Sequence, residues 1–373
     1  MSTAPTATAT TATETPPRRK RKRLQFHDLR VASIERLCDD AVAVTFDVPP
    51  ELADAFDFTP GQYLTLCRTV DGRKERRSYS ICARAGTPPR VGVREVPDGL
   101  FSQWLVHDVR PGDTIEVGTP IGKFTTEPES GGRHVLVAAG SGITPVISIA
   151  SSLLAGSDAH VTLLYGNRRT NTVMFAEELG DLKDAYGSRL ELVHVLSREP
   201  REVELFSGRL DGERVGALLD ALVPVDTVDG FWLCGPYEMV EDVRGVLAER
   251  GVGKERVHQE LFFAGDAPPA PVRHEEPGSD EPTSAVTMHL DGRSSTLSLP
   301  RSLPVLDSAQ RQRSDLPFAC KGGVYGTCRA QVTCGEVDMR RNYALEDDEV
   351  EAGFVLTCQS YPVSDEVTLD YDA

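Results

Sequence analysis

The chain has 373 residues, which is enough for two or three domains, and its 40% hydrophobic and 26% charged residues are typical of a globular protein. No apolar run approaches the roughly 20 residues of a membrane span, so we expect no transmembrane segment. The net charge of −17 disfavours nucleic acid and anionic lipid as partners.

The first residues are rich in Thr, Ala and Pro and end in the basic run 18–23. They contain no apolar stretch of the kind that a secretory signal requires. Residues 1–23 are therefore predicted to be a disordered tail, which is either solvated or docks on an acidic partner, and the protein is expected to be cytoplasmic.

Hydrophobic patterning divides the rest of the chain into three domains. Residues 24–128 are short alternating strands between turn sequences, which predicts a small β-barrel. Residues 129–263 alternate apolar strands with helical stretches, which predicts a doubly wound parallel sheet. Residues 264–283 are proline-rich and predicted to be a linker, and residues 284–373 form a third domain with four of the eight cysteines.

Two motifs of the predicted barrel contain groups that can hold a cofactor. In RSYS, Arg77 can bind a phosphate, Tyr79 can cover an aromatic ring, and Ser80 can offer a hydroxyl to a ring nitrogen. Further along, Gly99 and Ser102 open a predicted helix, FSQWLVHDV, whose amides can hold a pyrophosphate. Each motif alone also fits a plain strand or a helix cap, but their order and spacing favour a cofactor site.

Two further motifs follow predicted strands of the α/β domain. Gly140 and Gly142 form a strand-to-helix turn that lets the backbone approach a pyrophosphate, and Thr144 is expected to cap the helix. Cys234 and Gly235 end another strand at the carboxyl edge, where doubly wound sheets bind their ligands. Cys234 also fits a buried core thiol, but the order of the two motifs favours a binding site.

The motifs RSYS, GLFS, GSGITP and CGP, in this order, resemble the ferredoxin-NADP reductase superfamily, whose Greek-key barrel binds FAD and whose second domain binds a nicotinamide dinucleotide. The resemblance implies that the flavin and the pyrophosphates of the two dinucleotides are held by Arg77, Tyr79, Ser80, Gly99, Ser102, Gly140, Gly142 and Thr144.

The same resemblance implies that Cys234 and Gly235 lie beside the nicotinamide ring. Glu260 and Phe262, in HQELFF, would reach back towards the isoalloxazine, although both also fit a plain strand end. Ser80, Cys234 and Glu260 are thus the expected catalytic residues.

The groups after the second and third α/β strands bear on the choice of nicotinamide cofactor. Arg168 and Arg198 stand there, and the segment YGNRR contains no carboxylate that would bind a free ribose 2′-hydroxyl. We therefore expect NADPH rather than NADH, although surface arginines are also commonly only solvated.

The last domain resembles the plant-type 2Fe-2S ferredoxins, which implies a β-grasp-like α+β fold. Their ligand spacing is Cx4Cx2C with a distant fourth cysteine, and the corresponding residues are Cys320, Tyr325, Cys328 and Cys358. A tyrosine at the second position is a harder, longer ligand than a thiolate, so cluster assembly is in doubt. Cys334 is expected to be a surface thiol at a hairpin turn rather than a substitute ligand.

Taken together, the chain most resembles the reductase subunits of phenylacetyl-CoA epoxidase complexes. That resemblance implies electron transfer from NADPH through FAD and a 2Fe-2S cluster to a di-iron oxygenase subunit. The alternatives are a reductase for another oxygenase or hydroxylase, and an NADPH-FAD diaphorase whose cluster is lost through Tyr325. A docking protein that transfers nothing is a third alternative, but the two intact cofactor motifs argue against it.

Overall fold

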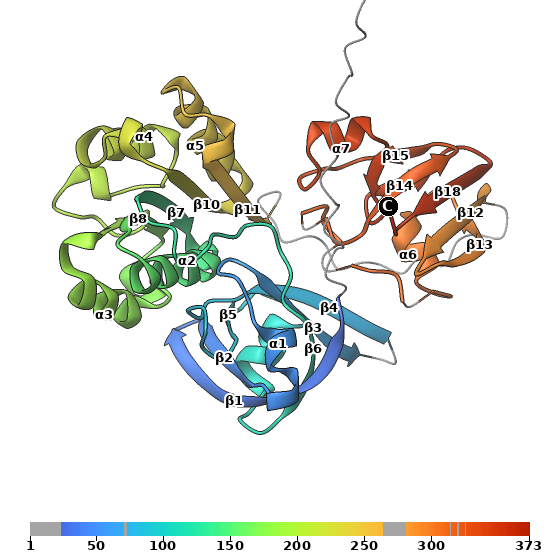
Figure 1. Cartoon of the computed structure of the whole chain (residues 1–373), viewed down its shortest axis with the longest axis horizontal. Coiled ribbons are helices and arrows are strands. Elements are labelled where there is room, and N and C mark those ends of the chain that lie inside the picture. The colour runs from blue at the N-terminus through green and yellow to red at the C-terminus, as the bar shows by residue number, and fades with distance from the viewer. Residues whose placement is uncertain (1–23, 71–72, 264–280, 314, 319–320, 325) are drawn as a thin grey trace, which may run out of the picture.

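The computed structural model describes residues 24–70, 73–263, 281–313, 315–318, 321–324 and 326–373. They form three lobes, each built on its own sheet (Figure 1). We name them the barrel lobe (24–128), the α/β lobe (129–263) and the C-terminal lobe (281–373).

The barrel lobe is a six-stranded antiparallel sheet in the order β4-β3-β6-β1-β2-β5. Ile81, just after β4, bridges to Val91 in β5, so the two end strands meet and the sheet closes. Alternating apolar residues such as Leu29, Leu64 and Leu66 fill its interior. Its elements are β1 (Phe26–Cys38), β2 (Ala41–Asp47), α1 (Ala53–Phe56), β3 (Tyr63–Val70), β4 (Arg73–Ser80), β5 (Arg90–Arg94), the helical turn η2 (Trp104–Asp108) and β6 (Thr114–Gly118).

The α/β lobe is a five-stranded parallel sheet in the order β11-β10-β7-β8-β9, with helices packed on both faces. The chain order reverses between β7 and β10, which makes this the point where doubly wound sheets bind ligands. Its elements are β7 (Arg133–Ala139), α2 (Ile143–Gly156), β8 (His160–Asn167), α3 (Ala176–Tyr186), β9 (Leu190–Leu196), α4 (Gly212–Leu222), β10 (Gly230–Pro236), α5 (Tyr237–Glu249) and β11 (Val257–Phe263).

The C-terminal lobe has a five-stranded mixed sheet in the order β13-β12-β18-β14-β16 and a two-stranded sheet of β15 and β17. Only the β12–β18 pairing of the larger sheet is parallel. Its elements are β12 (Thr283–Leu290), β13 (Arg293–Pro300), α6 (Val305–Ala309), β14 (Arg329–Cys334), β15 (Val337–Met339), α7 (Asp347–Glu351), β16 (Phe354–Leu356), β17 (Ser360–Pro362) and β18 (Glu366–Asp370).

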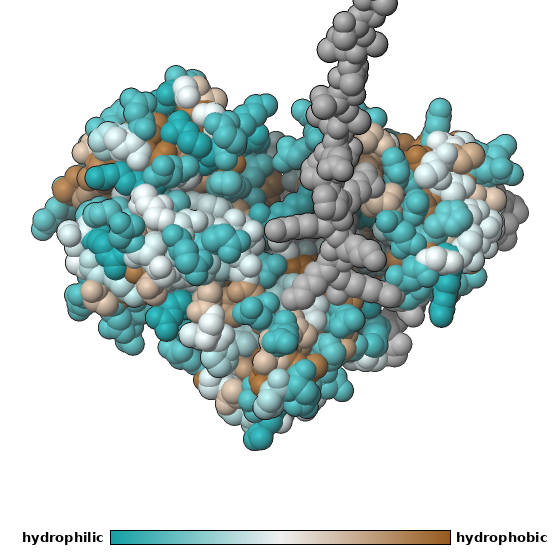
Figure 2. All heavy atoms as spheres, viewed as in Figure 1, coloured by the Kyte–Doolittle hydropathy of each residue, from teal (hydrophilic) through white to brown (hydrophobic). Residues whose placement is uncertain are grey.

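One hydrophobic core joins the barrel and α/β lobes. It contains Ala43 and Cys82 from the barrel together with most of the buried face of α2. Hydrophilic side chains predominate on all three lobes on the face shown in Figure 2, as expected for a chain with 26% charged residues. Among the described helices, none is both long and apolar enough to span a bilayer.

The predicted multidomain fold, with an antiparallel barrel and a doubly wound α/β domain, is confirmed. Three local details differ. The first strand, β1, was not predicted, and the helix expected from Phe101 is shortened to helical turns that include η2. The expected hairpin at Cys334 is also wrong, because β14 and β15 belong to different sheets. Residues 1–23 and nearly all of the predicted linker lie outside the described residues.

Candidate functional site

The predicted residues Ser80 and Glu260 meet where the barrel and α/β lobes join. The Ser80 hydroxyl, at the end of β4, donates a hydrogen bond of 3.0 Å to Oε2 of Glu260 in β11. Both residues are buried, and Cys234 is the β10 neighbour of Glu260 in the parallel ladder. The structure therefore brings the three expected catalytic residues to one point.

Burial controls the protonation of this group. Removal from water raises the pKa of Glu260 to about 8, while the Ser80 hydrogen bond partly opposes the rise. Burial also raises the pKa of the Cys234 thiol, and the neighbouring Glu260 raises it further. At neutral pH the site thus holds a protonated carboxyl and an un-ionised thiol, so its polar groups can orient a neutral aromatic ring and hold a proton at Glu260.

The two barrel motifs lie against each other. The guanidinium of Arg77 stands 5.6 Å from the centroid of the Phe101 ring, within GLFS, and is partly exposed. Burial raises the pKa of Tyr79, so its phenol stays neutral. The Ser102 hydroxyl accepts a 3.0 Å hydrogen bond from the amide of Val96, so this side chain closes its own loop.

A Cβ on Gly99 would lie 2.3 Å from Ser102 Oγ and 2.8 Å from the backbone carbonyl oxygen of Val96, which cannot rotate away. A glycine is therefore required for the loop to fold back on the serine. The result is a compact turn next to Arg77, in which the Gly99 amide donates to the carbonyl of Val96 at 2.9 Å.

The two α/β motifs also come together. A Cβ on Gly142 would lie 2.2 Å from the carbonyl oxygen of Cys234, so only glycine allows the turn after β7 to touch the end of β10. Gly140 has a φ of +55°, which again favours glycine. The prediction that Thr144 caps α2 is wrong: the helix begins at Ile143, and the Thr144 hydroxyl donates to the carbonyl of Ser141 at 3.0 Å.

The remaining predicted residues lie around this junction. Gly235 follows Cys234 in β10, and a Cβ there would lie 2.8 Å from the Met239 methyl group, so the residue is closely packed. Phe262 is partly buried against the core that joins the two lobes. Both residues therefore lie close in the chain to the Cys234–Glu260 pair: Gly235 follows Cys234 in β10, and Phe262 follows Glu260 by two positions in β11.

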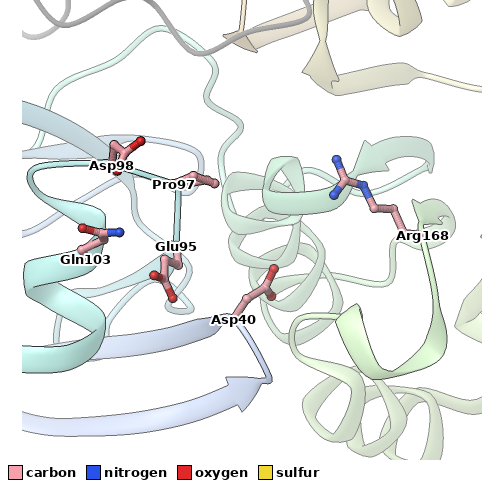
Figure 3. Close-up of a pocket in the computed structure, with 6 residues that line it drawn as sticks. All are labelled: Asp40, Glu95, Pro97, Asp98, Gln103 and Arg168. Carbon is pink, nitrogen blue, oxygen red and sulfur yellow. The ribbon is translucent and has the colours of Figure 1, made fainter.

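Arg168 and Arg198 are neighbours at the carboxyl edge of the α/β sheet, because the amide of Arg198 donates to the carbonyl of Arg168 at 2.8 Å. Arg168 also lines a cleft of about 410 Å³ between the two lobes, opposite barrel carboxylates (Figure 3). The cleft is lined by Asp40, Glu95, Pro97, Asp98, Gln103 and Arg168. The backbone of Arg198 thus lies against that of Arg168, whose side chain lines the cleft.

The sequence analysis missed Arg94 at the end of β5. Its guanidinium lies 3.3 Å from the position of a Cβ on Gly140 and pairs with Asp40 at 3.3 Å. A barrel arginine thus reaches the glycine turn of the other lobe. No sequence signal marks it, because the contact forms only when the two lobes pack together.

The described part of the expected cluster loop contains two of the three predicted cysteine ligands. Cys328 and Cys358 are buried, and a hydrogen bond between their side chains lowers the pKa of Cys328. Gly323 and Gly326 have positive φ values of 80° and 64°, which give the tight loop that cluster ligation needs. These residues fit a 2Fe-2S cluster at two ligand positions, whereas Cys320 and Tyr325 lie outside the described residues.

Within the described residues no group of three His, Cys, Asp or Glu side chains is placed to hold a metal ion. Cys334 is exposed, which confirms the prediction of a surface thiol.

Comparison with known proteins assigns a family to each lobe. Residues 28–126 match an oxidoreductase FAD-binding domain, residues 136–245 an oxidoreductase NAD-binding domain, and residues 288–363 a 2Fe-2S iron-sulfur cluster binding domain. The chain therefore carries domains for FAD, a nicotinamide dinucleotide and a 2Fe-2S cluster.

One subunit of the 1,2-phenylacetyl-CoA epoxidase from Escherichia coli is 41% identical over 355 residues, which cover 93% of this chain and 98% of that protein. The ferredoxin reductase component of 3-ketosteroid-9-alpha-monooxygenase from Rhodococcus rhodochrous is 36% identical, with 92% and 96% covered. The chain belongs to this family of oxygenase reductase components. Like its relatives, this reductase is an oxidoreductase whose partner is an oxygenase.

A solved structure supports the fold of the whole reductase. Phthalate dioxygenase reductase superposes with a TM-score of 0.61, covering 92% of this chain and 98% of that chain at 24% identity. The fold of nearly the whole chain is therefore shared with that structure.

Proposed function

We propose that this reductase takes electrons from NADPH and supplies them to the di-iron oxygenase of a phenylacetyl-CoA epoxidase complex. The main structural support for electron transfer from NADPH is the buried hydrogen bond of 3.0 Å between Ser80 and Glu260. Support for the acceptor comes from the 41% identity to a protein of such an epoxidase over nearly the whole of both chains.

Bound FAD would accept a hydride from the nicotinamide and release the electrons one at a time, which lets it connect NADPH to a one-electron cluster. Ser80 would orient the ring through its hydroxyl, and Glu260 would hold a proton next to it. Arg77 and the Gly99–Ser102 turn would bind the FAD phosphates. Gly140 and Gly142 would let the pyridine-dinucleotide pyrophosphate approach the turn after β7.

The order of the lobes suits this route. Glu260 accepts a hydrogen bond from Ser80 at the end of a barrel strand and is the β11 neighbour of Cys234 in β10. A nicotinamide next to Cys234 would therefore face a flavin next to Ser80. Burial excludes water from this point, which protects a hydride from solvent.

A second candidate acceptor is a steroid-oxidising oxygenase, because the 3-ketosteroid monooxygenase reductase is 36% identical over 352 residues. The two acceptors can be separated by mixing the purified reductase, NADPH and either oxygenase with its substrate. We expect NADPH-dependent epoxidation of phenylacetyl-CoA. Turnover of the ketosteroid alone would reassign the partner, and dye reduction without turnover of either substrate would identify a diaphorase.

A further inference from the structure

The expected cluster loop touches the barrel through a hydroxyl pair. The phenol oxygen of Tyr63 lies 2.9 Å from Oγ1 of Thr327. Tyr63 is only 4% exposed, and Thr327 directly precedes the buried Cys328. The hydrogen bond thus ends one residue from an expected cluster ligand.

Tyr63 is held firmly on the barrel side. Its amide donates to the carbonyl of Ile121 at 2.8 Å, and the Ile121 amide donates back to Tyr63 at 3.2 Å. In the β3–β4 hairpin Tyr63 pairs with Ser80, the residue proposed to contact the flavin ring. The phenol therefore extends from the position opposite Ser80 to the C-terminal lobe.

Arg76 makes a second contact between the same hairpin and the same loop. Its guanidinium lies 4.6 Å from the Phe26 ring centroid and 4.9 Å from that of Phe318, so it is sandwiched between aromatic rings of two lobes. Arg76 is only 9% exposed, so it is a buried contact between the lobes rather than a solvated surface arginine. Phe318 precedes the first expected cluster ligand by two residues.

The C-terminal lobe also reaches the α/β lobe. The ring of Tyr343 lies 5.3 Å from that of Tyr237, which follows the Cys234-Gly235-Pro236 motif. Val324 of the cluster loop packs against the α/β core as well. The loop is thus seated where both cofactor-binding lobes meet it, with the C-terminal lobe beside β4 (Figure 1).

We infer that Tyr63 and Arg76 are positioning residues that hold the cluster loop against the flavin-binding hairpin, and that the Tyr63–Thr327 hydrogen bond is the coupling route for the one-electron step. The inference rests on the proposed function. Each transfer moves one electron from the flavin site to the cluster site, and the electron acceptor takes it from there. Two transfers follow each hydride, the proton of that hydride is released from the flavin site to solvent, and both hydroxyls keep their protons. Tunnelling weakens steeply with separation, so loosening this contact slows the step.

The test compares Tyr63→Phe, Thr327→Val and the double variant, in which the hydroxyl groups of the pair are removed and the rest of each side chain is kept close to its original size. Matched controls are Tyr186→Phe in α3 and Thr287→Val in β12, which remove the same hydroxyls away from the contact between the lobes and outside the segment that is measured. The Thr287 hydroxyl is also one of a hydroxyl pair, with Thr296 at 2.8 Å. Hydrogen exchange of the segment 326–334 reports docking whether or not a cluster is present. Flavin bleaching by NADPH and cytochrome c reduction report the two electron-transfer steps.

We expect exchange in segment 326–334 to rise and cytochrome c reduction to fall about 2- to 10-fold in each single variant, because one hydrogen bond is lost. The double variant should lose no more than a single one, since both substitutions break the same bond. Flavin bleaching should match that of the controls.

The inference would be overturned if the variants matched the controls in both the hydrogen exchange of segment 326–334 and the rate of cytochrome c reduction. Failure of the proposed function looks different, because the unsubstituted protein would then not be bleached by NADPH. If NADPH bleaches the flavin of the unsubstituted protein while no cytochrome c is reduced, hydrogen exchange of segment 326–334 tests the docking role. Cytochrome c reduction by the same variants in a Tyr325→Cys background then tests the coupling role. Arg76→Met provides a second variant, and it too should raise exchange in the loop.

Discussion

Ser80 and Glu260 are 180 positions apart in the chain, yet their side chains share a buried hydrogen bond of 3.0 Å. Ser80 ends a barrel strand and Glu260 lies in the edge strand of the α/β sheet, so one polar contact ties together the two proposed cofactor lobes. A carboxyl in this place stays protonated at neutral pH because burial raises its pKa to about 8. The catalytic predictions follow from that protonation.

Flavin reduction by NADPH should slow as the pH rises through 8, the approximate pKa of Glu260. Above that pH the carboxyl becomes an anion, which can no longer supply a proton and opposes the arrival of hydride. We expect the rate to fall roughly 10- to 100-fold across the transition. Stopped-flow bleaching of the flavin over a pH series measures it.

In Glu260→Gln the side chain cannot ionise, so its rate should be low at neutral pH and show no inflection near 8. An inflection that persists in this variant would mean that another group titrates. The amide retains the size of the carboxyl, so the comparison tests charge rather than packing.

Ser80→Ala should move the inflection to higher pH. The Ser80 hydrogen bond favours the charged form of Glu260 and lowers its pKa, so removing the hydroxyl leaves burial unopposed. The same variant should lose about 1 to 3 kcal/mol of stability, because Glu260 loses a buried partner. Bleaching profiles and chemical unfolding measure the two effects, and an unshifted inflection would contradict the assigned cause.

The motifs could be located from sequence because each needs particular residues at fixed spacing. The close approach of Gly142 to Cys234 is an example, since only glycine tolerates a carbonyl oxygen 2.2 Å from a Cβ position. The order of strands and glycine turns likewise predicted the doubly wound lobe. The Thr144 cap was wrong because a threonine in the first turn can donate to a nearby carbonyl as readily as it can accept from an amide.

Contacts between lobes were not predictable. Tyr63 and Thr327 are 264 positions apart, and neither residue type implies the other. Arg94 reaches Gly140 only because β5 packs beside the turn after β7. Such contacts depend on how folded lobes dock, and periodicity or local spacing carries no information about docking.

Replacing both Arg168 and Arg198 by alanine should raise the KM for NADPH about 10- to 100-fold, the effect of losing hydrogen bonds to a charged phosphate. The KM for NADH should change little, because NADH lacks the 2′-phosphate. Arg209→Ala is the matched control, since Arg209 is an arginine of the same lobe with a side chain 79% exposed. Equal changes for both nucleotides would place the arginines elsewhere than at the ribose phosphate.

Tyr325→Cys should raise the content of the purified protein to about two irons and two acid-labile sulfides per FAD, because four thiolates complete the expected ligand set. Tyr325→Ser removes the phenol without adding a thiolate, so it should not raise the iron content. Replacing the exposed Cys334 by serine should change neither quantity. A full cluster in the unsubstituted protein would show that Tyr325 or water serves as the fourth ligand.

Acid should destabilise the α/β lobe through a histidine pair. The Trp232 ring stacks on His258 at 4.1 Å and its Nε1 donates to His134 at 3.4 Å. Burial lowers the pKa of both histidines below 6.5, so the unfolded chain binds more protons than the folded one as the pH falls below that value. Stability is therefore full above pH 6.5 and lost progressively below it.

His258→Phe keeps a ring for Trp232 to stack on and removes one titrating group. Its stability should fall less steeply below pH 6.5, by at most about 1.4 kcal/mol per pH unit, which is the slope that one proton contributes. Thermal unfolding followed through tryptophan fluorescence measures the slope, because Trp232 lies at the affected contact. The exposed His160→Phe is the control, and identical slopes in all three proteins would assign the acid sensitivity to other groups.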